Sequence, residues 1–270
     1  MSDQIREAPV SAGVTDQVRE PPAPAAPHGA VTPRGALFVA VVFACVFPTV
    51  MAWTYFLLLP SGEGKLNPWQ QAAYAVGKVV QFTFPVVFLW WLEGFPRPGR
   101  PHFRGLPAAL AFGLAVMLTM FALYWGVLRG SPVLAKTPGQ VRLKLIELGA
   151  DTPGRYLALA TFIVLAHSLL EEYYWRWFVF GQLRRLTTFL PAAVVSSLCF
   201  MAHHVIILAV YLPGYFWAAV VPFSLGIAVG GFVWAWLYER NGSVYAPWLS
   251  HLLVDAAIFV IGWDLAGLGG

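Results

Sequence analysis

The chain is dominated by apolar runs of about 20 residues, each long enough to cross the ~30 Å hydrocarbon core of a bilayer as a helix. A helix satisfies its backbone hydrogen bonds internally, as lipid requires of any segment that crosses it. The sequence therefore predicts an all-α fold, a polytopic transmembrane helix bundle with about seven spans. The predicted spans are residues 36–59, 71–92, 106–128, 156–183, 189–212, 215–238 and 244–266.

Composition supports this class of protein and argues against others. Hydrophobic residues make up 59% of the chain and charged residues 11%, whereas soluble domains carry about 25% charged residues. The net charge of +4 is spread over the loops rather than gathered in one patch. This distribution favours membrane lipids as partners and argues against nucleic-acid binding. Cys45 and Cys199 lie inside apolar runs and form neither a disulfide framework nor a metal-type spacing.

Two segments differ from the spans. Residues 1–34 mix charges with Pro, Ala and Gly and contain no aromatic residue, so they cannot bury enough surface to fold. We predict a disordered cytoplasmic tail at 1–34 and one transmembrane domain at 35–270. The amphipathic stretch at 141–149 is expected to lie on the membrane surface rather than across it.

Basic residues in short loops set the expected orientation. The loops after the second, fourth and sixth spans lie on one side and carry three, two and one arginine respectively, whereas those after the first and fifth carry almost no net positive charge. This bias predicts a cytoplasmic N-terminus, although the connection after the third span is also basic. The Ala/Pro/Arg/Gly-rich tail indicates a bacterial inner membrane protein. The loop arginines are Arg97, Arg100, Arg104, Arg184, Arg185 and Arg240.

Ionisable side chains recur inside three of the predicted spans. Each charge near the bilayer centre costs roughly 2.5–3.5 kcal/mol on insertion scales, so three helices carrying them predict a shared polar cavity for chemistry or transport. At 1.5 Å per residue, Glu171 lies about 20 Å from Arg184 and His251 about 16 Å from Arg240, which places these groups at a similar depth. The residues are Glu171, Glu172, Arg176, His203, His204, His251 and Asp255.

Helical spacing divides the roles in the fourth and seventh spans. Adjacent glutamates point about 100° apart, so we expect only one of them to face the cavity. Glu172 lies four residues before Arg176, the spacing of an ion pair, which leaves Glu171 as a candidate general base. His251 and Asp255 also lie four residues apart and could support an oxyanion or complete a metal site.

Other polar and small residues are assigned to structure. His167 is expected to be a partner of Glu171 or an interhelical hydrogen bonder, and His203 a packing group that faces away from His204. Lys78 is interpreted as an interfacial or helix-packing residue, and Cys199 as buried apolar filling. Three glycines in the sixth span predict a close helix approach; they are Gly226, Gly230 and Gly231.

Three motifs resemble those of the CPBP family of intramembrane proteases, which comprises CAAX prenyl endopeptidases and bacteriocin-processing "Abi" proteases, with sortase-like bacterial relatives. EEYYWR matches EExxxR, FMAHH matches FxxxH, and HLLVD matches HxxxN/D, in the family's order over residues 160–262. The resemblance implies that Glu171 and His204 activate water, while His251 and Asp255 support the oxyanion. It also implies that Glu172 and Arg176 hold the site together.

The resemblance leaves the cofactor open and indicates a substrate class. The family is often described as metalloproteases, and a glutamate-driven mechanism without metal has also been proposed. A zinc ion would have Glu171, His204, His251 and Asp255 as candidate ligands. Asp255 stands where Asn is common, and an ionised Asp cannot donate to an oxyanion. The implied partner is a protein substrate with a C-terminal membrane anchor or lipid.

Two other functions are compatible with buried ionisable groups. A proton- or ion-coupled transporter also uses chains of Glu, His and Asp, but the chain lacks the doubled hydropathy pattern of many transporters. A non-catalytic membrane scaffold would be marked by loss of Glu171 or His204, and both residues are present. The sequence therefore favours an intramembrane endopeptidase.

Overall fold

A computed structural model describes residues 33–60, 67–94 and 103–269. Its described residues form helices and turns and include no strand. Seven helical segments are long and apolar enough to cross a membrane, which confirms the predicted fold class. They are Arg34–Leu58, Pro68–Glu93, Leu106–Leu128, Pro153–Leu186, Phe189–Tyr211, Phe216–Asn241 and Tyr245–Ala266. The predicted tail lies outside the described residues except at its last two positions.

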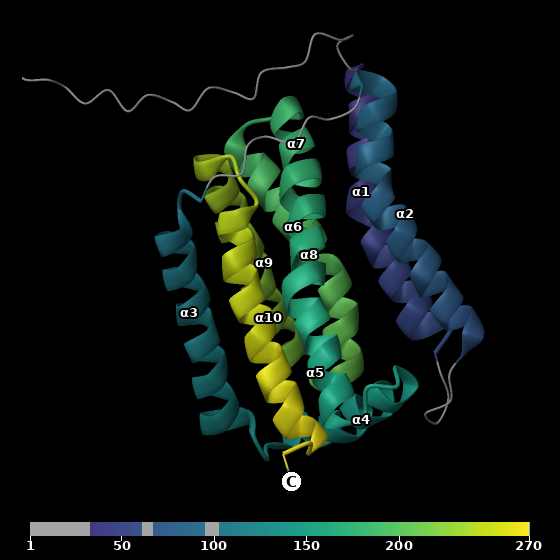
Figure 1. Cartoon of the computed structure of the whole chain (residues 1–270), viewed down its shortest axis with the longest axis vertical. Coiled ribbons are helices and arrows are strands. Elements are labelled where there is room, and N and C mark those ends of the chain that lie inside the picture. The colour runs from purple at the N-terminus through teal and green to yellow at the C-terminus, as the bar shows by residue number, and fades with distance from the viewer. Residues whose placement is uncertain (1–32, 61–66, 95–102, 270) are drawn as a thin grey trace, which may run out of the picture.

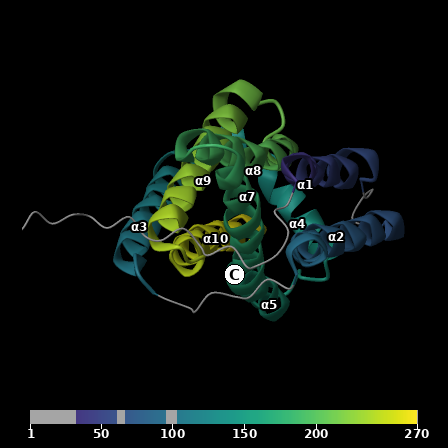
Figure 2. The same ribbon diagram turned by 90° about the horizontal axis from the view of Figure 1, so that it is seen from above.

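The spans run side by side along the long axis of the molecule (Figures 1 and 2). On one flank, α1 (Arg34–Trp53) lies beside α2 (Pro68–Glu93), and on the other α3 (Leu106–Leu123) packs against α10 (Tyr245–Ala266). The central pair is α8 (Phe189–Tyr211) and α9 (Val221–Asn241). The π-helical turns η1 (Thr54–Leu58), η2 (Tyr124–Leu128) and η6 (Phe216–Val220) extend three of these spans.

Some span boundaries differ from the prediction because residues that cap the helix ends, rather than hydropathy, determine where the helices begin and end. The second span begins at Pro68 instead of residue 71, because the Asn67 side chain accepts hydrogen bonds from the backbone N–H groups of Trp69 and Gln70. The sixth span continues to Asn241 and stops at Gly242, whose φ of 62° lies in the left-handed region.

The fourth span is built from five consecutive helical pieces. These are α5 (Pro153–Thr161), η4 (Phe162–His167), α6 (Ser168–Glu172), η5 (Tyr173–Phe180) and α7 (Gly181–Leu186), of which η4 and η5 are π-helical. Turns of π-helix inside α-helices are frequent at functional sites. Both adjacent glutamates lie on the short α-helical piece between the two π-helical ones, and the η5 side chains are the largest buried group of the core.

The amphipathic stretch forms a short helix that is not one of the spans. It is α4 (Thr137–Glu147), which follows the 3-10 turn η3 (Pro132–Leu134) and begins four residues earlier than predicted. The Gln140 amide donates to the Val210 carbonyl at 2.7 Å, and Arg142 Nε donates to the Ala266 carbonyl at 2.9 Å. These bonds fix α4 across the last turns of α8 and α10, at the end of the molecule that holds the C-terminus (Figure 1).

Only one of the three glycines in the sixth span behaves as predicted. A Cβ on Gly231 would lie 3.3 Å from the Ser197 Cα, so this glycine allows α9 to approach α8 closely. Gly226 has nothing within 4 Å of such a Cβ, and Gly230 faces only the Trp234 ring of its own helix. For these two positions the predicted helix contact is wrong, because they lie on other faces of α9.

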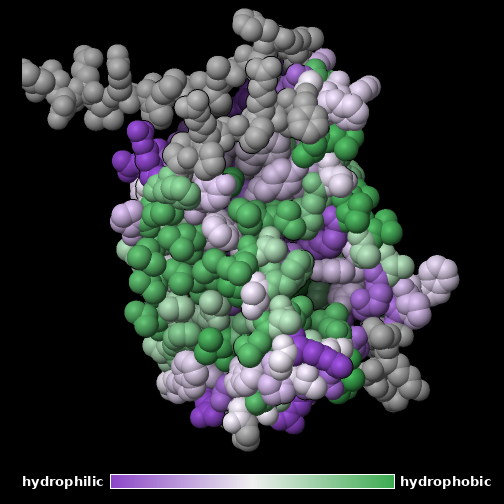
Figure 3. All heavy atoms as spheres, viewed as in Figure 1, coloured by the Kyte–Doolittle hydropathy of each residue, from purple (hydrophilic) through white to green (hydrophobic). Residues whose placement is uncertain are grey.

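The outer surface is apolar over the middle of the molecule. On the face shown in Figure 3, hydrophobic residues form a broad central band and hydrophilic residues gather toward the ends. Large side chains are exposed in this way on several spans, among them Phe38, Val39, Leu58, Leu118 and Val229. Apolar surface of this extent marks a membrane-contacting protein, and with the seven spans it makes the chain an integral membrane protein.

Candidate active site

His251 on α10 connects both glutamates of α6. Its Nδ1 lies 2.7 Å from Glu172 Oε1, and its Nε2 lies 3.7 Å from Glu171 Oε2 and 3.6 Å from Asp255 Oδ1. Both glutamates therefore contact the same imidazole, which the sequence did not predict. The reason is that the two ring nitrogens point in opposite directions, so one imidazole inserted between the helices reaches carboxylates that diverge on α6.

The predicted ion pair between Glu172 and Arg176 is present. Arg176 Nη1 lies 2.9 Å from Glu172 Oε1, and both side chains are almost completely buried. The guanidinium carbon is also 4.9 Å from the ring centroids of Phe200 and of Trp234, a distance at which aromatic faces attract a cation. Glu172 thus binds Arg176 and His251 at once, and it joins the fourth and seventh spans.

The two neighbouring histidines of α8 have different surroundings. His204 Nδ1 lies 2.9 Å from the Phe200 carbonyl, which can only accept, so Nδ1 donates and Nε2 carries the lone pair of the neutral ring. The His204 ring centroid lies 4.1 Å from that of His203, so His203 does not face away from His204 as expected. His203 is buried and stacks on Trp175, with the ring centroids 5.8 Å apart and the planes 4° from parallel. The neighbouring rings therefore have different partners, the Phe200 carbonyl for His204 and the Trp175 ring for His203.

Trp234 on α9 fixes the plane of the His251 ring. The two rings stack with centroids 4.3 Å apart at 16°. The indole N–H of Trp234 donates to the Ser250 hydroxyl at 3.0 Å, which holds the indole in place. Sequence analysis did not identify Trp234, because a tryptophan in an apolar run gives no signal that separates packing from a role beside the site.

A fourth helix, α2, contributes Lys78 to the same cluster. Lys78 Nζ lies 3.1 Å from His167 Nε2, and this ring nitrogen lies 3.9 Å from Glu171 Oε1. The predicted interhelical hydrogen bond of His167 is therefore present, although its partner was not foreseen. The signal for that partner was available, since a lysine inside a span is as costly as the glutamates are.

The candidate zinc ligands come from three different spans. Among the residues that the structure describes, no three His, Cys, Asp or Glu side chains gather as a ligand set for a metal ion. The four candidates, Glu171, His204, His251 and Asp255, lie in one region but do not present such a set in this arrangement. The chemistry below is therefore derived from the side chains alone.

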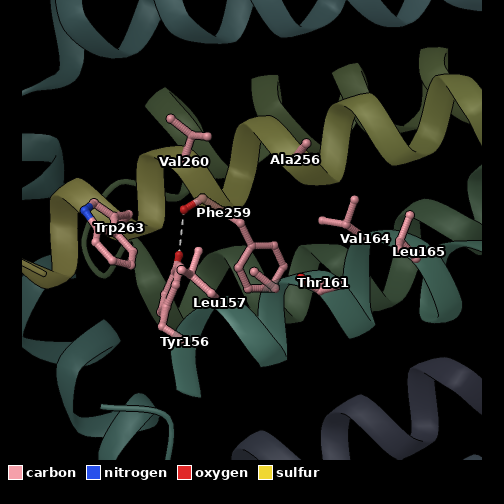
Figure 4. Close-up of a pocket in the computed structure, with 10 residues that line it drawn as sticks. Tyr156, Leu157, Thr161, Val164, Leu165, Ala256, Phe259, Val260 and Trp263 are labelled. Carbon is pink, nitrogen blue, oxygen red and sulfur yellow. Dashed lines mark hydrogen bonds between the residues drawn. The ribbon is translucent and has the colours of Figure 1, made fainter. Parts of the chain in front are cut away.

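A groove farther along the same helices has a different character. It has a volume of about 510 Å³ and runs between α5 and η4 on one side and α10 on the other (Figure 4). None of its lining residues is acidic or basic. The dashed line in Figure 4 marks the hydrogen bond that the Tyr156 hydroxyl donates to the Phe259 carbonyl at 2.6 Å. This groove offers apolar surface rather than groups for acid–base chemistry.

The helical membrane bundle brings a glutamate and imidazole groups from separate spans together in its interior, as a membrane-embedded enzyme requires. Residues 153–257 match the family model described as Type II CAAX prenyl endopeptidase Rce1-like. This match agrees with the CPBP resemblance of the motifs and supports a membrane protease. The comparisons with curated proteins and with solved structures found no match.

Proposed function

We propose that the protein is an endopeptidase that hydrolyses a peptide bond near the membrane-anchored or lipid-modified C-terminus of a protein substrate. The observation that carries this proposal is the position of the Glu171 carboxylate. It lies 3.7 Å from His251 Nε2 and 3.9 Å from His167 Nε2. One carboxylate in contact with imidazoles from separate helices is suited to activate a water molecule.

In the proposed reaction, Glu171 takes a proton from a water molecule that also hydrogen-bonds to His204. The hydroxide oxygen attacks the carbonyl carbon of the peptide and forms a tetrahedral oxyanion. The C–N bond then breaks, and the departing amine receives the proton that Glu171 holds. His204 is suited to its part because its Nδ1 is bonded to the Phe200 carbonyl, which leaves Nε2 to accept from the water.

We assign the oxyanion to His251, with Asp255 as its support. Glu172 holds His251 at Nδ1, so in its protonated form the ring can donate from Nε2 to a developing negative charge. Asp255 lies 3.6 Å from the same Nε2. An ionised Asp255 orients the ring, and a protonated Asp255 can donate as well. Glu172 and Arg176 act by position, since their ion pair fixes the end of α6 against α9 and α10.

The same argument favours a glutamate-driven reaction over one that requires zinc, because Glu171 and His204 suffice to activate water. We also propose that the protein lies in a bacterial inner membrane with its N-terminus in the cytoplasm. Support for this orientation comes from one end of the bundle, where Arg184 and Arg185 lie at the end of α7 and Arg240 near the end of α9.

The decisive experiment separates a protease from a transporter. Purified protein is reconstituted into vesicles that contain peptides with a C-terminal apolar helix or a lipidated cysteine, and the products are identified by mass spectrometry. We expect cleavage close to the anchor, with no proton flux reported by a pH-sensitive dye inside the vesicles. Proton flux that depends on Glu171, without cleavage of either peptide class, would show that the protein is a transporter rather than a protease.

A further inference from the structure

Lys78 lies outside the segment that matches the protease family, yet it contacts that segment beside the proposed base. It is part-buried on α2, and its ammonium lies 5.3 Å from the Phe82 ring centroid and 5.7 Å from that of Tyr74. Lys78 and His167 also line a groove of about 410 Å³ between α2 and the fourth span. On the side where α2 lies, the surface in Figure 3 is hollowed.

The hydrogen-bonding capacity of the two groups restricts how they can meet. An ammonium has three donors and no acceptor, so a charged Lys78 can only donate to His167 Nε2. A counter-charge for the ammonium is close by, because Glu171 Oε1 lies 3.9 Å from the same Nε2 atom. The Nε2 atom that faces Lys78 is then the acceptor of the neutral ring, and the ring proton is on Nδ1.

We propose that Lys78 is a positioning residue, which keeps His167 Nε2 unprotonated and so leaves the Glu171 carboxylate free to take a proton from water. Without Lys78, a protonated Nε2 would have Glu171 Oε1, 3.9 Å away, as an acidic neighbour. His167 would then donate to the base and compete with water for its lone pairs. The proposal rests on the function proposed above and adds α2 to the unit that performs it.

The kinetic test uses Lys78→Met, which keeps the length of the side chain and removes its charge. We expect kcat to fall about 10- to 100-fold, as for other misplaced catalytic groups, with KM changed less than about threefold. Lys78→Arg should restore most of kcat. The control is Lys136→Met, an exposed lysine on the loop before α4, which should leave both constants unchanged.

The second test reads the tautomer of His167 directly and needs no substrate. In protein labelled with ¹⁵N-histidine, with His167→Gln used for assignment, we expect the proton on Nδ1 in wild type and on Nε2 in Lys78→Met. A wild-type proton on Nε2 would overturn the proposal, even if Lys78→Met did not fold. A raised KM with unchanged kcat would overturn it too, since Lys78 would then bind an anionic substrate group. If the wild-type protein cleaved no substrate, the proposed protease function would be refuted, but the proposed effect of Lys78 on the His167 tautomer would not.

Discussion

The fourth and seventh spans build two sites that differ in almost every respect. Near Glu171 and His251, charged and imidazole groups from four helices lie within hydrogen-bonding or short electrostatic range of one another. Two turns farther along α10, Phe259 and Trp263 line a groove whose side chains are apolar (Figure 4). The backbone is helical in both places, so the difference lies in a few side chains, which confine the charged groups to one level.

The largest expected difference in activity is between variants of the neighbouring histidines His203 and His204. We expect His204→Ala to lower cleavage by at least about 100-fold, because a group that assists proton transfer is lost. His203→Ala should leave a measurable fraction of activity, since its ring packs on Trp175. Initial rates in reconstituted vesicles measure both variants. The reverse order would show that His203, and not His204, serves the reaction.

A second prediction concerns the buried ion pair. Glu172→Gln strands the Arg176 guanidinium in the core and weakens the hold on His251, so we expect the free energy of unfolding to fall by about 3–5 kcal/mol. Denaturant titration or thermal unfolding in detergent provides the measurement. The matched control is Arg129→Gln, which breaks the exposed ion pair with Asp264 and should change stability little. Equal losses in both variants would refute the special role of the buried pair.

These expectations also show how far the sequence could lead. Hydropathy predicted the seven spans, and the rise per residue placed Glu171 and His251 at a common depth. The sequence could not show that one imidazole reaches both Glu171 and Glu172, because this contact depends on how α10 is rotated and inserted beside α6. For the same reason Lys78 could not be assigned to His167, and the docking of α4 depends on side-chain bonds to carbonyls at helix ends.

A third prediction tests Asp255 and metal together. In a glutamate-driven mechanism, Asp255→Asn should keep activity or raise it a few-fold, because an amide donates to an oxyanion at any pH. Cleavage rates and elemental analysis of the same preparations provide the measurement. About one zinc per active protein, lost together with activity in Asp255→Asn, would contradict this mechanism.

The smallest effect is expected in the apolar groove. Tyr156→Phe removes the hydroxyl that donates to the Phe259 carbonyl, so stability should fall by about 1 kcal/mol. Cleavage should remain at the wild-type rate, because no group of the proposed reaction contacts this hydroxyl. If activity fell as far as in His204→Ala, the separation between the polar and apolar sites would be wrong.

The most direct test of the central claim is single-turnover cleavage by Glu171→Gln in vesicles, with its unfolding temperature measured alongside. The amide keeps the size of the side chain but cannot take a proton from water. We predict no more than a few per cent of the wild-type rate, in protein that is folded and inserted in the membrane. Near-normal cleavage by this variant would contradict the assignment of Glu171 as the base.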